Sequence, residues 1–243
     1  MTKLSISFLL LSVSLFATTN PYPFSCQEAI NTDFVAKYEM QTPKTTTSVN
    51  YYRQASKIAY EYPEQGMTEV WIKMPHNQTS LIRGFDHYKK SIEYEPIDLK
   101  MENKNSSWTQ QENFLSPAQF GFKEGSKSSI NGCVISHFER KENGKSILID
   151  WYEPKKLLLS FEMKNREKTS YKYTLSSFEK ITPEVNHLQN VLNYDATDFA
   201  DIGDNESDPF FRKMINLGFI SHHEANIIDE NGNRIETQEH HKH

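Results

Sequence analysis

Hydrophobic and polar residues alternate along residues 128–181, and the alternation predicts four consecutive strands. The runs that begin at Ile147, Leu157 and Tyr171 each place apolar side chains at every second position. A period of two directs successive side chains to opposite faces of a strand, so each run can bury one face. Between two of the runs, Asn143-Gly144 is typical of a two-residue hairpin turn. We therefore predict an antiparallel meander at the centre of the protein.

A second set of strands is predicted earlier in the chain, between residues 44 and 97. Apolar residues alternate with polar ones over 58–62 and 70–74, and further runs cover 80–85 and 88–94. Prolines, glycine and asparagine interrupt the runs at 63–66 and 75–77, as expected for turns. Gly84 and Asp86 indicate a bend or a bulge near the end of the third run.

Four helical segments are expected around these strands. Ser25 and Glu28 form a capping box ahead of apolar residues at helical spacing, which predicts a helix up to residue 41. A helical insert is expected near 105–117, and a further helical turn over 182–191. Asp208-Pro209 predicts the start of a last helix near 208–217, because proline is favoured at the first helical position and a carboxylate suits the N-terminal dipole.

The N-terminus predicts export. Lys3 precedes an apolar run over 4–16, small residues follow, and prolines come next. This order is that of a signal peptide, assigned to 1–19, and the apolar run is too short to span a bilayer. We expect a single domain over 20–220 and a flexible, His-rich tail over 221–243. The mature protein would be periplasmic, with no transmembrane segment.

Charge and cysteine content narrow the function classes. The 243-residue chain has a formal net charge of −5 and no basic cluster, which argues against a nucleic-acid partner. Its two cysteines, Cys26 and Cys133, lack the Cys-x-x-Cys spacing of redox enzymes. In an oxidising compartment such a pair favours a disulfide, which here would close a loop of about a hundred residues.

Candidate catalytic chemistry is sparse. An acidic run over 195–208 includes Asp198, Asp201 and Asp204, weak candidates for calcium ligands, although the spacing is not that of an EF-hand. A solvated loop with helix caps explains the same residues. No serine-hydrolase, zinc-protease or phosphate-loop motif occurs in the sequence. The prediction is therefore a non-enzymatic protein without a cofactor.

The order of elements, together with the run from Ile147 to Pro154, resembles the Lol-type (LolA/LolB-like) outer-membrane lipoprotein carriers over roughly residues 26–180. The resemblance implies an α+β, mainly β fold: a long curved antiparallel sheet, or half-barrel, that wraps a few helices and encloses a site for acyl chains. The acidic run lies outside that pattern, and it resembles the tail of uncharacterised exported bacterial proteins.

The leading hypothesis is a periplasmic carrier for a hydrophobic ligand, such as a lipid or a lipidated protein, possessing an apolar and aromatic sheet face. Two alternatives remain open: an envelope protein-interaction module that uses the same sheet without a cavity, and a metal-dependent hydrolase that uses the acidic run. The side chains expected to line the ligand face alternate along the strands, and they are Trp71, Ile149, Trp151, Leu159, Phe161 and Tyr173.

Overall fold

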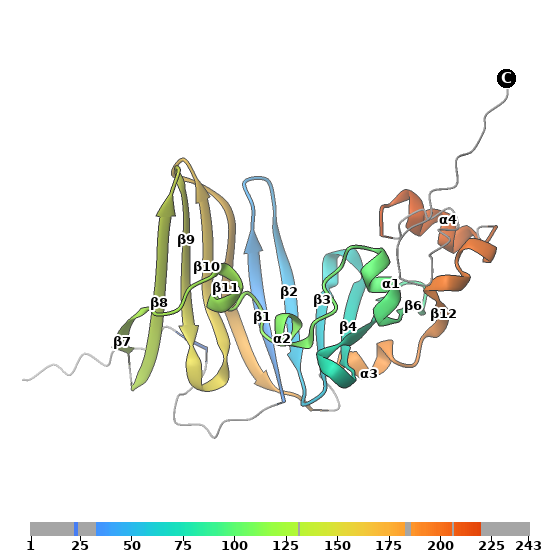
Figure 1. The fold of residues 1–243 in the computed structure, drawn as a ribbon, viewed down its shortest axis with the longest axis horizontal. Coiled ribbons are helices and arrows are strands. Elements are labelled where there is room, and N and C mark those ends of the chain that lie inside the picture. Colours follow the sequence, from blue (N-terminus) through green and yellow to red (C-terminus); the bar gives the residue numbers. More distant parts are fainter. Residues whose placement is uncertain (1–21, 24–32, 131, 183–185, 206, 220–243) are drawn as a thin grey trace, which may run out of the picture.

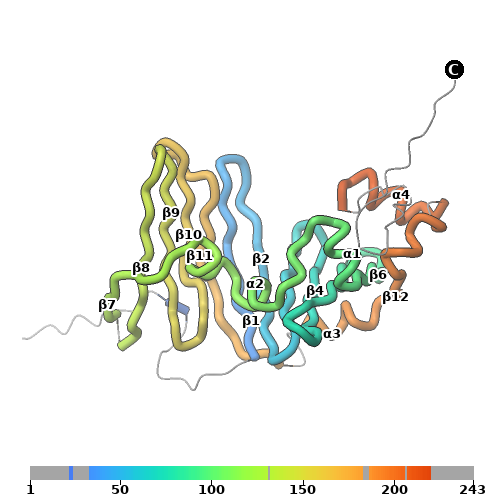
Figure 2. The backbone as a smooth tube through the Cα atoms, in the orientation of Figure 1, coloured from blue at the N-terminus to red at the C-terminus, as the bar shows by residue number. Residues whose placement is uncertain are grey.

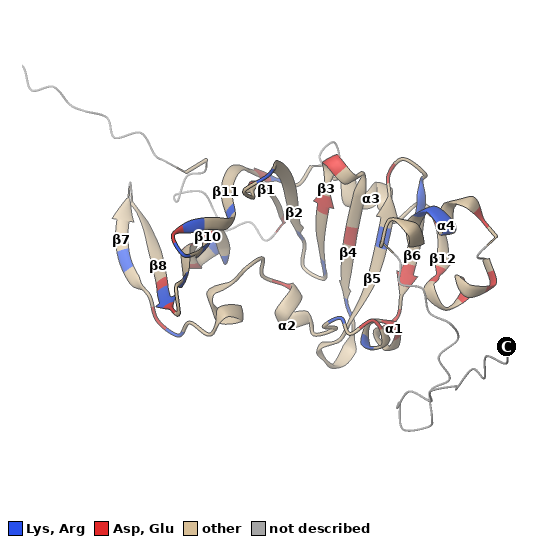
Figure 3. Cartoon of the chain, turned by 90° about the horizontal axis from the view of Figure 1, so that it is seen from above, with Lys and Arg blue, Asp and Glu red and all other residues tan. Residues whose placement is uncertain are grey.

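A computed structural model of the chain describes residues 22–23, 33–130, 132–182, 186–205 and 207–219, and their strands form a single sheet (Figure 1). The sheet has twelve strands in the order β12-β6-β5-β4-β3-β2-β1-β11-β10-β9-β8-β7. It is open and curled, with helices only at its faces and one end (Figure 3). The predicted fold class, mainly β with a long curved antiparallel sheet, is confirmed.

Two meanders build the sheet. Six strands run consecutively in the first: β1 (Phe34–Gln41), β2 (Thr46–Arg53), β3 (Lys57–Tyr62), β4 (Met67–Lys73), β5 (Thr79–Phe85) and β6 (Lys90–Tyr94). Five follow in the second: β7 (Ser126–Ile130), β8 (Cys133–Glu142), β9 (Lys145–Tyr152), β10 (Leu157–Asn165) and β11 (Lys168–Lys180). The last strand of the second meander, β11, pairs antiparallel with β1, so the two halves meet at the first strand.

The remaining strand and the helices lie at the edge and on the faces. Strand β12 (Asp195–Asp198) pairs parallel with β6, whereas the other described strand pairs are antiparallel. The α-helices are α1 (Pro96–Met101), α2 (Trp108–Gln111), α3 (His187–Val191) and α4 (Pro209–Asn216). Short 3-10 turns are η1 (Pro63–Gln65), η2 (Pro75–Asn77), η3 (Pro117–Phe120), η4 (Glu153–Lys155), η6 (Phe199–Asp201) and η7 (Gly203–Asn205). No described helix is long and apolar enough to cross a membrane.

The strand order forces two long connections to cross the sheet. Since β6 and β7 lie near opposite ends of the sheet, residues 95–125 run across one face, carrying α1 and α2 (Figure 2). We call this segment the strap and the face beneath it the strap face. Between β11 and β12, residues 186–194 lie over the opposite face and carry α3, and we call that side the α3 face (Figure 3).

Each crossing covers its own apolar cluster. The larger cluster lies mainly on the strap face and includes Leu99 and Trp108 of the strap together with Phe210 and Met214 of α4. The smaller cluster joins Leu188 and Val191 of α3 to residues of β1–β4, namely Val35, Tyr52, Ala59 and Val70. The central strands are thus buried on both faces.

The helix predicted up to residue 41 is wrong from Phe34 onwards, where the chain forms β1. Phe34, Ala36 and Tyr38 belong to the strap-face cluster, while Val35 belongs to the α3-face cluster. A strand covered on both faces loses its apolar–polar alternation. The spacing of Phe34 and Tyr38 then fits a helix as well as a strand.

Most other elements match their predictions. The turn between β8 and β9 places Asn143 and Gly144 at φ of 51° and 75°, as a type I′ hairpin requires. Helix α4 begins after Asp208, whose side chain accepts a hydrogen bond from Phe210 N at 2.7 Å. The predicted insert is less regular than expected, because α2 is a single turn followed by η3. Gly84 lies in an unbroken β4–β5 register instead of a bulge.

Candidate functional site

An aromatic cradle is the most distinctive feature of the strap face. Phe114 of the strap lies among four tyrosines of the sheet, with ring centroids 5.0 Å from Tyr38, 5.8 Å from Tyr51, 5.6 Å from Tyr60 and 5.4 Å from Tyr173. The tyrosines come from β1, β2, β3 and β11, which are neighbours only because β11 pairs with β1. Their arrangement forms a socket for one apolar group, and the strap supplies that group.

Tyrosine hydroxyls of the cradle also bind the strap backbone. The Tyr51 hydroxyl donates to Glu112 O at 2.7 Å, and the Tyr60 hydroxyl donates to Gln111 O at 3.0 Å. Burial raises the pKa of both phenols well above the ordinary value, so they remain neutral donors. The cradle therefore presents apolar rings with two hydrogen-bond donors at its rim.

The strap is held to the sheet at a second point by Asn77 of η2. The Asn77 side chain accepts from Thr109 N at 3.2 Å and Oγ1 at 2.9 Å, and it donates to Ser107 Oγ at 3.0 Å. The neighbouring Trp108 is buried and donates from Nε1 to Glu112 Oε2 at 2.9 Å. These polar contacts lie at the surface, where water competes for them.

Trp71 Nε1 and the Tyr94 hydroxyl of the strap face are among the buried donors that have no hydrogen-bond partner within the described residues. They stand in one cross-strand row, since Leu81 of β5 lies opposite both Trp71 and Tyr94. An unsatisfied buried donor costs about 1–3 kcal/mol. Burial raises the pKa of Tyr94 to about 12, which keeps the hydroxyl protonated. Both groups are suited to an oxygen acceptor.

The six residues predicted to line the ligand face all lie on the strap face. Trp71, Ile149, Trp151, Leu159 and Phe161 are buried in the cluster, and Tyr173 is half-buried against it. Phe161 stands opposite Ile149 on one side and Tyr173 on the other. Trp151 donates from Nε1 to Glu153 Oε2 at 2.8 Å. Strand alternation thus grouped these residues, and strap side chains such as Phe120, 5.1 Å from Phe161, cover them.

Sequence reasoning missed Tyr38, Tyr51, Tyr60 and Phe114 as cradle residues. Tyr38 fell within the predicted helix, and the partnership of β1 with β11 leaves no local trace in the sequence. The aromatic-heavy composition, with 12 tyrosines and 15 phenylalanines, was the only available signal.

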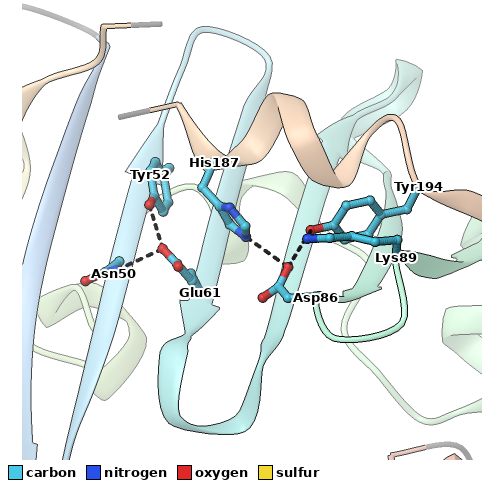
Figure 4. Close-up of polar contacts among 7 residues, drawn as sticks. All are labelled: Asn50, Tyr52, Glu61, Asp86, Lys89, His187 and Tyr194. Carbon is cyan, nitrogen blue, oxygen red and sulfur yellow. Dashed lines mark hydrogen bonds and ion pairs between the residues drawn. The ribbon is translucent and has the colours of Figure 1, made fainter. Parts of the chain in front are cut away.

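A polar network fastens α3 to the other face of the sheet (Figure 4). Asp86, just after β5, is its hub: Oδ1 is 3.0 Å from His187 Nε2 and accepts from the Tyr194 hydroxyl at 2.8 Å. Lys89 donates to the Tyr194 hydroxyl at 3.3 Å. In the same view, Glu61 accepts from Tyr52 at 2.5 Å.

The pKa values of Asp86 and His187 are shifted in the directions that their mutual hydrogen bond predicts. Burial alone would raise the pKa of Asp86, but hydrogen bonds from His187 and Tyr194 outweigh burial and lower it. The hydrogen bond to Asp86 raises the pKa of His187 above its usual 6.5, against the opposing effect of burial. Each of these residues has a structural partner, so the network acts as a tether for α3.

The acidic run is used largely for capping. Asp198 accepts from Ala200 N at 3.1 Å at the start of η6, and Asp201 O accepts from Asn205 Nδ2 at 2.9 Å. Asp204 lies in η7. Within the described residues, no three His, Cys, Asp or Glu side chains are grouped as a metal site requires. The described Asp198, Asp201 and Asp204 therefore do not gather around a common point.

The predicted signal peptide, Cys26 and the His-rich tail lie outside the described residues. Cys133, the other half of the predicted disulfide, is completely buried at the start of β8. The pairing of Cys26 with Cys133 remains a prediction.

No protein-family model and no curated protein matches the chain. Among solved structures, a structure of PNGF-II aligns with 72% of this chain and 33% of its own, at 12% identity and a TM-score of 0.41. MucB in the Pseudomonas aeruginosa MucA/MucB complex aligns with 65% of this chain and 55% of its own, at 8% identity and a TM-score of 0.40. The chain thus spans a third to about half of these proteins, and likeness at this level implies nothing about activity or partners.

Proposed function

We propose that this protein is a carrier whose strap face binds a hydrophobic ligand, such as a lipid or the acyl chain of a lipidated protein, without chemistry at that face. The observation that carries the proposal is the aromatic cradle, which accepts one apolar group from a segment with little regular structure of its own. When the strap leaves the sheet, an acyl chain takes the place of Phe114. The six side chains predicted from the sequence to line the ligand face then extend the contact along the sheet.

The unpartnered donors suggest which ligands fit best. Trp71 Nε1 and the Tyr94 hydroxyl gain acceptors if the ligand carries ester or carboxyl oxygens, and the Tyr51 and Tyr60 hydroxyls released by the strap do likewise. A buried hydrogen bond of this kind contributes about 1 kcal/mol net. Acyl esters and fatty acids are therefore preferred over plain hydrocarbons.

Export is part of the same proposal. Residues 1–19 are proposed as a signal peptide removed on transport to the periplasm, and Cys26 then pairs with Cys133 in that oxidising compartment. N-terminal sequencing of the mature protein from the periplasm tests the first point. Mass mapping of unreduced peptides tests the second, since a Cys26–Cys133 cross-linked peptide should appear.

Exchange of Phe114 for alanine tests the carrier proposal directly. Phe114→Ala should lower the free energy of unfolding by about 2 kcal/mol, because a half-buried ring is lost. It should also raise affinity for a lysophospholipid or a fatty acid by about tenfold, since the strap competes less well. Native mass spectrometry and titrations followed by tryptophan fluorescence measure the binding affinity for each of the two ligands.

Phe122→Ala is the matched control. Phe122 belongs to the same segment and packs 5.6 Å from Phe138, outside the cradle. The Phe122→Ala substitution should destabilise the fold without increasing the affinity for either ligand. If neither the parent nor Phe114→Ala binds either ligand, the strap is permanent packing and the face serves a protein-interaction module instead.

A further inference from the structure

Three side chains on adjacent strands form a hydrogen-bonded relay in the order serine, histidine, aspartate. Ser128 Oγ of β7 lies 2.6 Å from His137 Nε2 of β8, and His137 Nδ1 lies 2.7 Å from Asp150 Oδ1 of β9. The pairing of β7 with β8 and of β8 with β9 brings them together, with His137 directly opposite Asp150.

The relay fixes the tautomer of the histidine. A carboxylate only accepts hydrogen bonds, so Nδ1 carries the imidazole proton and donates it to Asp150. Nε2 is then left with a lone pair that accepts the hydroxyl proton of Ser128. This is the protonation arrangement in which a histidine acts as a general base towards a serine.

Asp150 is itself oriented by a fourth residue. Ser160 of β10 donates from Oγ to Asp150 Oδ2 at 2.8 Å, so both carboxylate oxygens are engaged. The relay is also open to a reactant, since the His137 and Asp150 side chains are 35% and 37% exposed. Tyr22 adjoins the same carboxylate, whose charge adds to burial in raising the phenol pKa.

We propose that Ser128 and His137 are catalytic residues of a second, hydrolytic site for carboxylic esters, with Asp150 and Ser160 as positioning residues. Ser128 Oγ attacks the ester carbonyl carbon while His137 Nε2 takes the hydroxyl proton. The bond to the alcohol breaks, and His137 returns that proton to the leaving oxygen. Water then attacks the acyl group, gives its proton to His137, and releases the carboxylic acid as the proton returns to Ser128.

This site is separate from the strap face. Asp150 lies between Ile149 and Trp151 in β9, and adjacent residues of a strand point to opposite faces. Phe138 lies opposite Ile149 and packs against Phe122 of the strap, so Ile149 and Trp151 face the strap and the relay occupies the other side of the sheet. The inference consequently stands or fails independently of ligand binding under the strap.

Covalent labelling of the full chain with an alkyl fluorophosphonate tests the proposal. The reaction forms an Oγ–P bond at Ser128, breaks the P–F bond and releases fluoride, and peptide mapping should place the adduct on Ser128. His137→Gln should slow labelling and hydrolysis of p-nitrophenyl acetate by about 10²-fold or more. Ser129→Ala, on the same strand but the opposite face, should leave both rates unchanged.

The positioning role of Asp150 has its own spectroscopic readout. In Asp150→Asn the amide can donate to Nδ1 and move the imidazole proton to Nε2, which no longer accepts from Ser128. Imidazole ¹⁵N chemical shifts should show the Nδ1–H tautomer in the parent and the Nε2–H tautomer in the variant. Thermal unfolding confirms that the variant remains folded, so that a tautomer change is not mistaken for local unfolding.

A cysteine variant provides a second measurement that does not depend on turnover. In Ser128→Cys, His137 should make the thiol react with iodoacetamide at least about tenfold faster at neutral pH than the thiol of Ser129→Cys. Equal alkylation rates for the two cysteines would overturn the proposal. So would a folded parent protein without an adduct at Ser128, or His137→Gln labelled as fast as the parent.

Discussion

At the residue scale, close approach decides how the crossing segments pack. Gly84 in β5 lies directly beneath α3 and the residues that follow it, and a Cβ built on Gly84 would stand 2.5 Å from Val191 Cγ1 and 3.3 Å from Tyr194. The sequence marked Gly84 as unusual but suggested a bend. The true cause is a residue more than a hundred positions away, which no local pattern reveals.

Gly84→Ala should therefore destabilise the protein by about 1–3 kcal/mol, because α3 must move away from the sheet to admit the methyl group. Chemical denaturation measures the change. Gly203→Ala is the control: its Cβ meets nothing within 4 Å, so it should be nearly neutral. Equal effects of the two substitutions would argue against close packing of α3 at Gly84.

At the element scale, alternation predicted most strands, including β3 and β4, but failed at β1, where both faces are covered. The meander from β8 to β11 and the helix after Asp208 were predicted from period and capping alone. Strand β1 was missed because its burial comes from two crossing segments that belong to distant parts of the chain. The same long-range origin explains why the six predicted residues included Tyr173 but not the other side chains of the cradle.

The short helix α3 should be held on the sheet by the Asp86–His187 pair, and the stability that this pair contributes should depend on pH. The raised pKa of His187 stabilises the fold fully below about 6.5, and this contribution is lost as pH rises through the folded pKa. The lowered pKa of Asp86 stabilises it above about 3.8, and that contribution is lost as pH falls through the folded pKa. The pair should therefore contribute most between about pH 4 and 6.5.

Asp86→Asn should remove both pH-dependent contributions to stability. It should lower the free energy of unfolding by about 2 kcal/mol at pH 6, as expected for the loss of hydrogen bonds to a charged group. Unfolding free energies measured from about pH 2 to 9 provide the comparison, since the contribution of Asp86 is lost only below about pH 3.8. A parent and variant with parallel pH profiles would show that the pair does not control docking. Asp201→Asn, on the exposed η6, serves as the reference for loss of a carboxylate.

At the scale of the whole molecule, β1 joins two meanders that are each continuous in sequence. It pairs with β2 along its full length and with β11 from Phe34–Lys180 to Gln41–Lys172. Alternation predicted two blocks of strands, and the resemblance to Lol-type carriers implied a curved sheet. The position of β1 as the seam between the two meanders depends on pairings across most of the chain.

Amide hydrogen exchange should display this arrangement. Amides of β1, bonded on both sides and buried on both faces, should open only with global unfolding. Amides of β7 and β12, at the two edges of the sheet, should exchange far faster. Comparable protection for β1 and β7 would contradict a continuous twelve-stranded sheet.

The seam also has a consequence for biogenesis. A chain that emerges N-terminus first can complete β1–β6 while β11 is still being delivered, so β1 spends that interval as a bare sheet edge. Exposed edges recruit other chains, and their unpaired amides and carbonyls template aggregation. Successful folding therefore depends on how fast the second half of the chain arrives to pair with β1, which makes the rate of synthesis, or a chaperone that holds the first half, a determinant of yield.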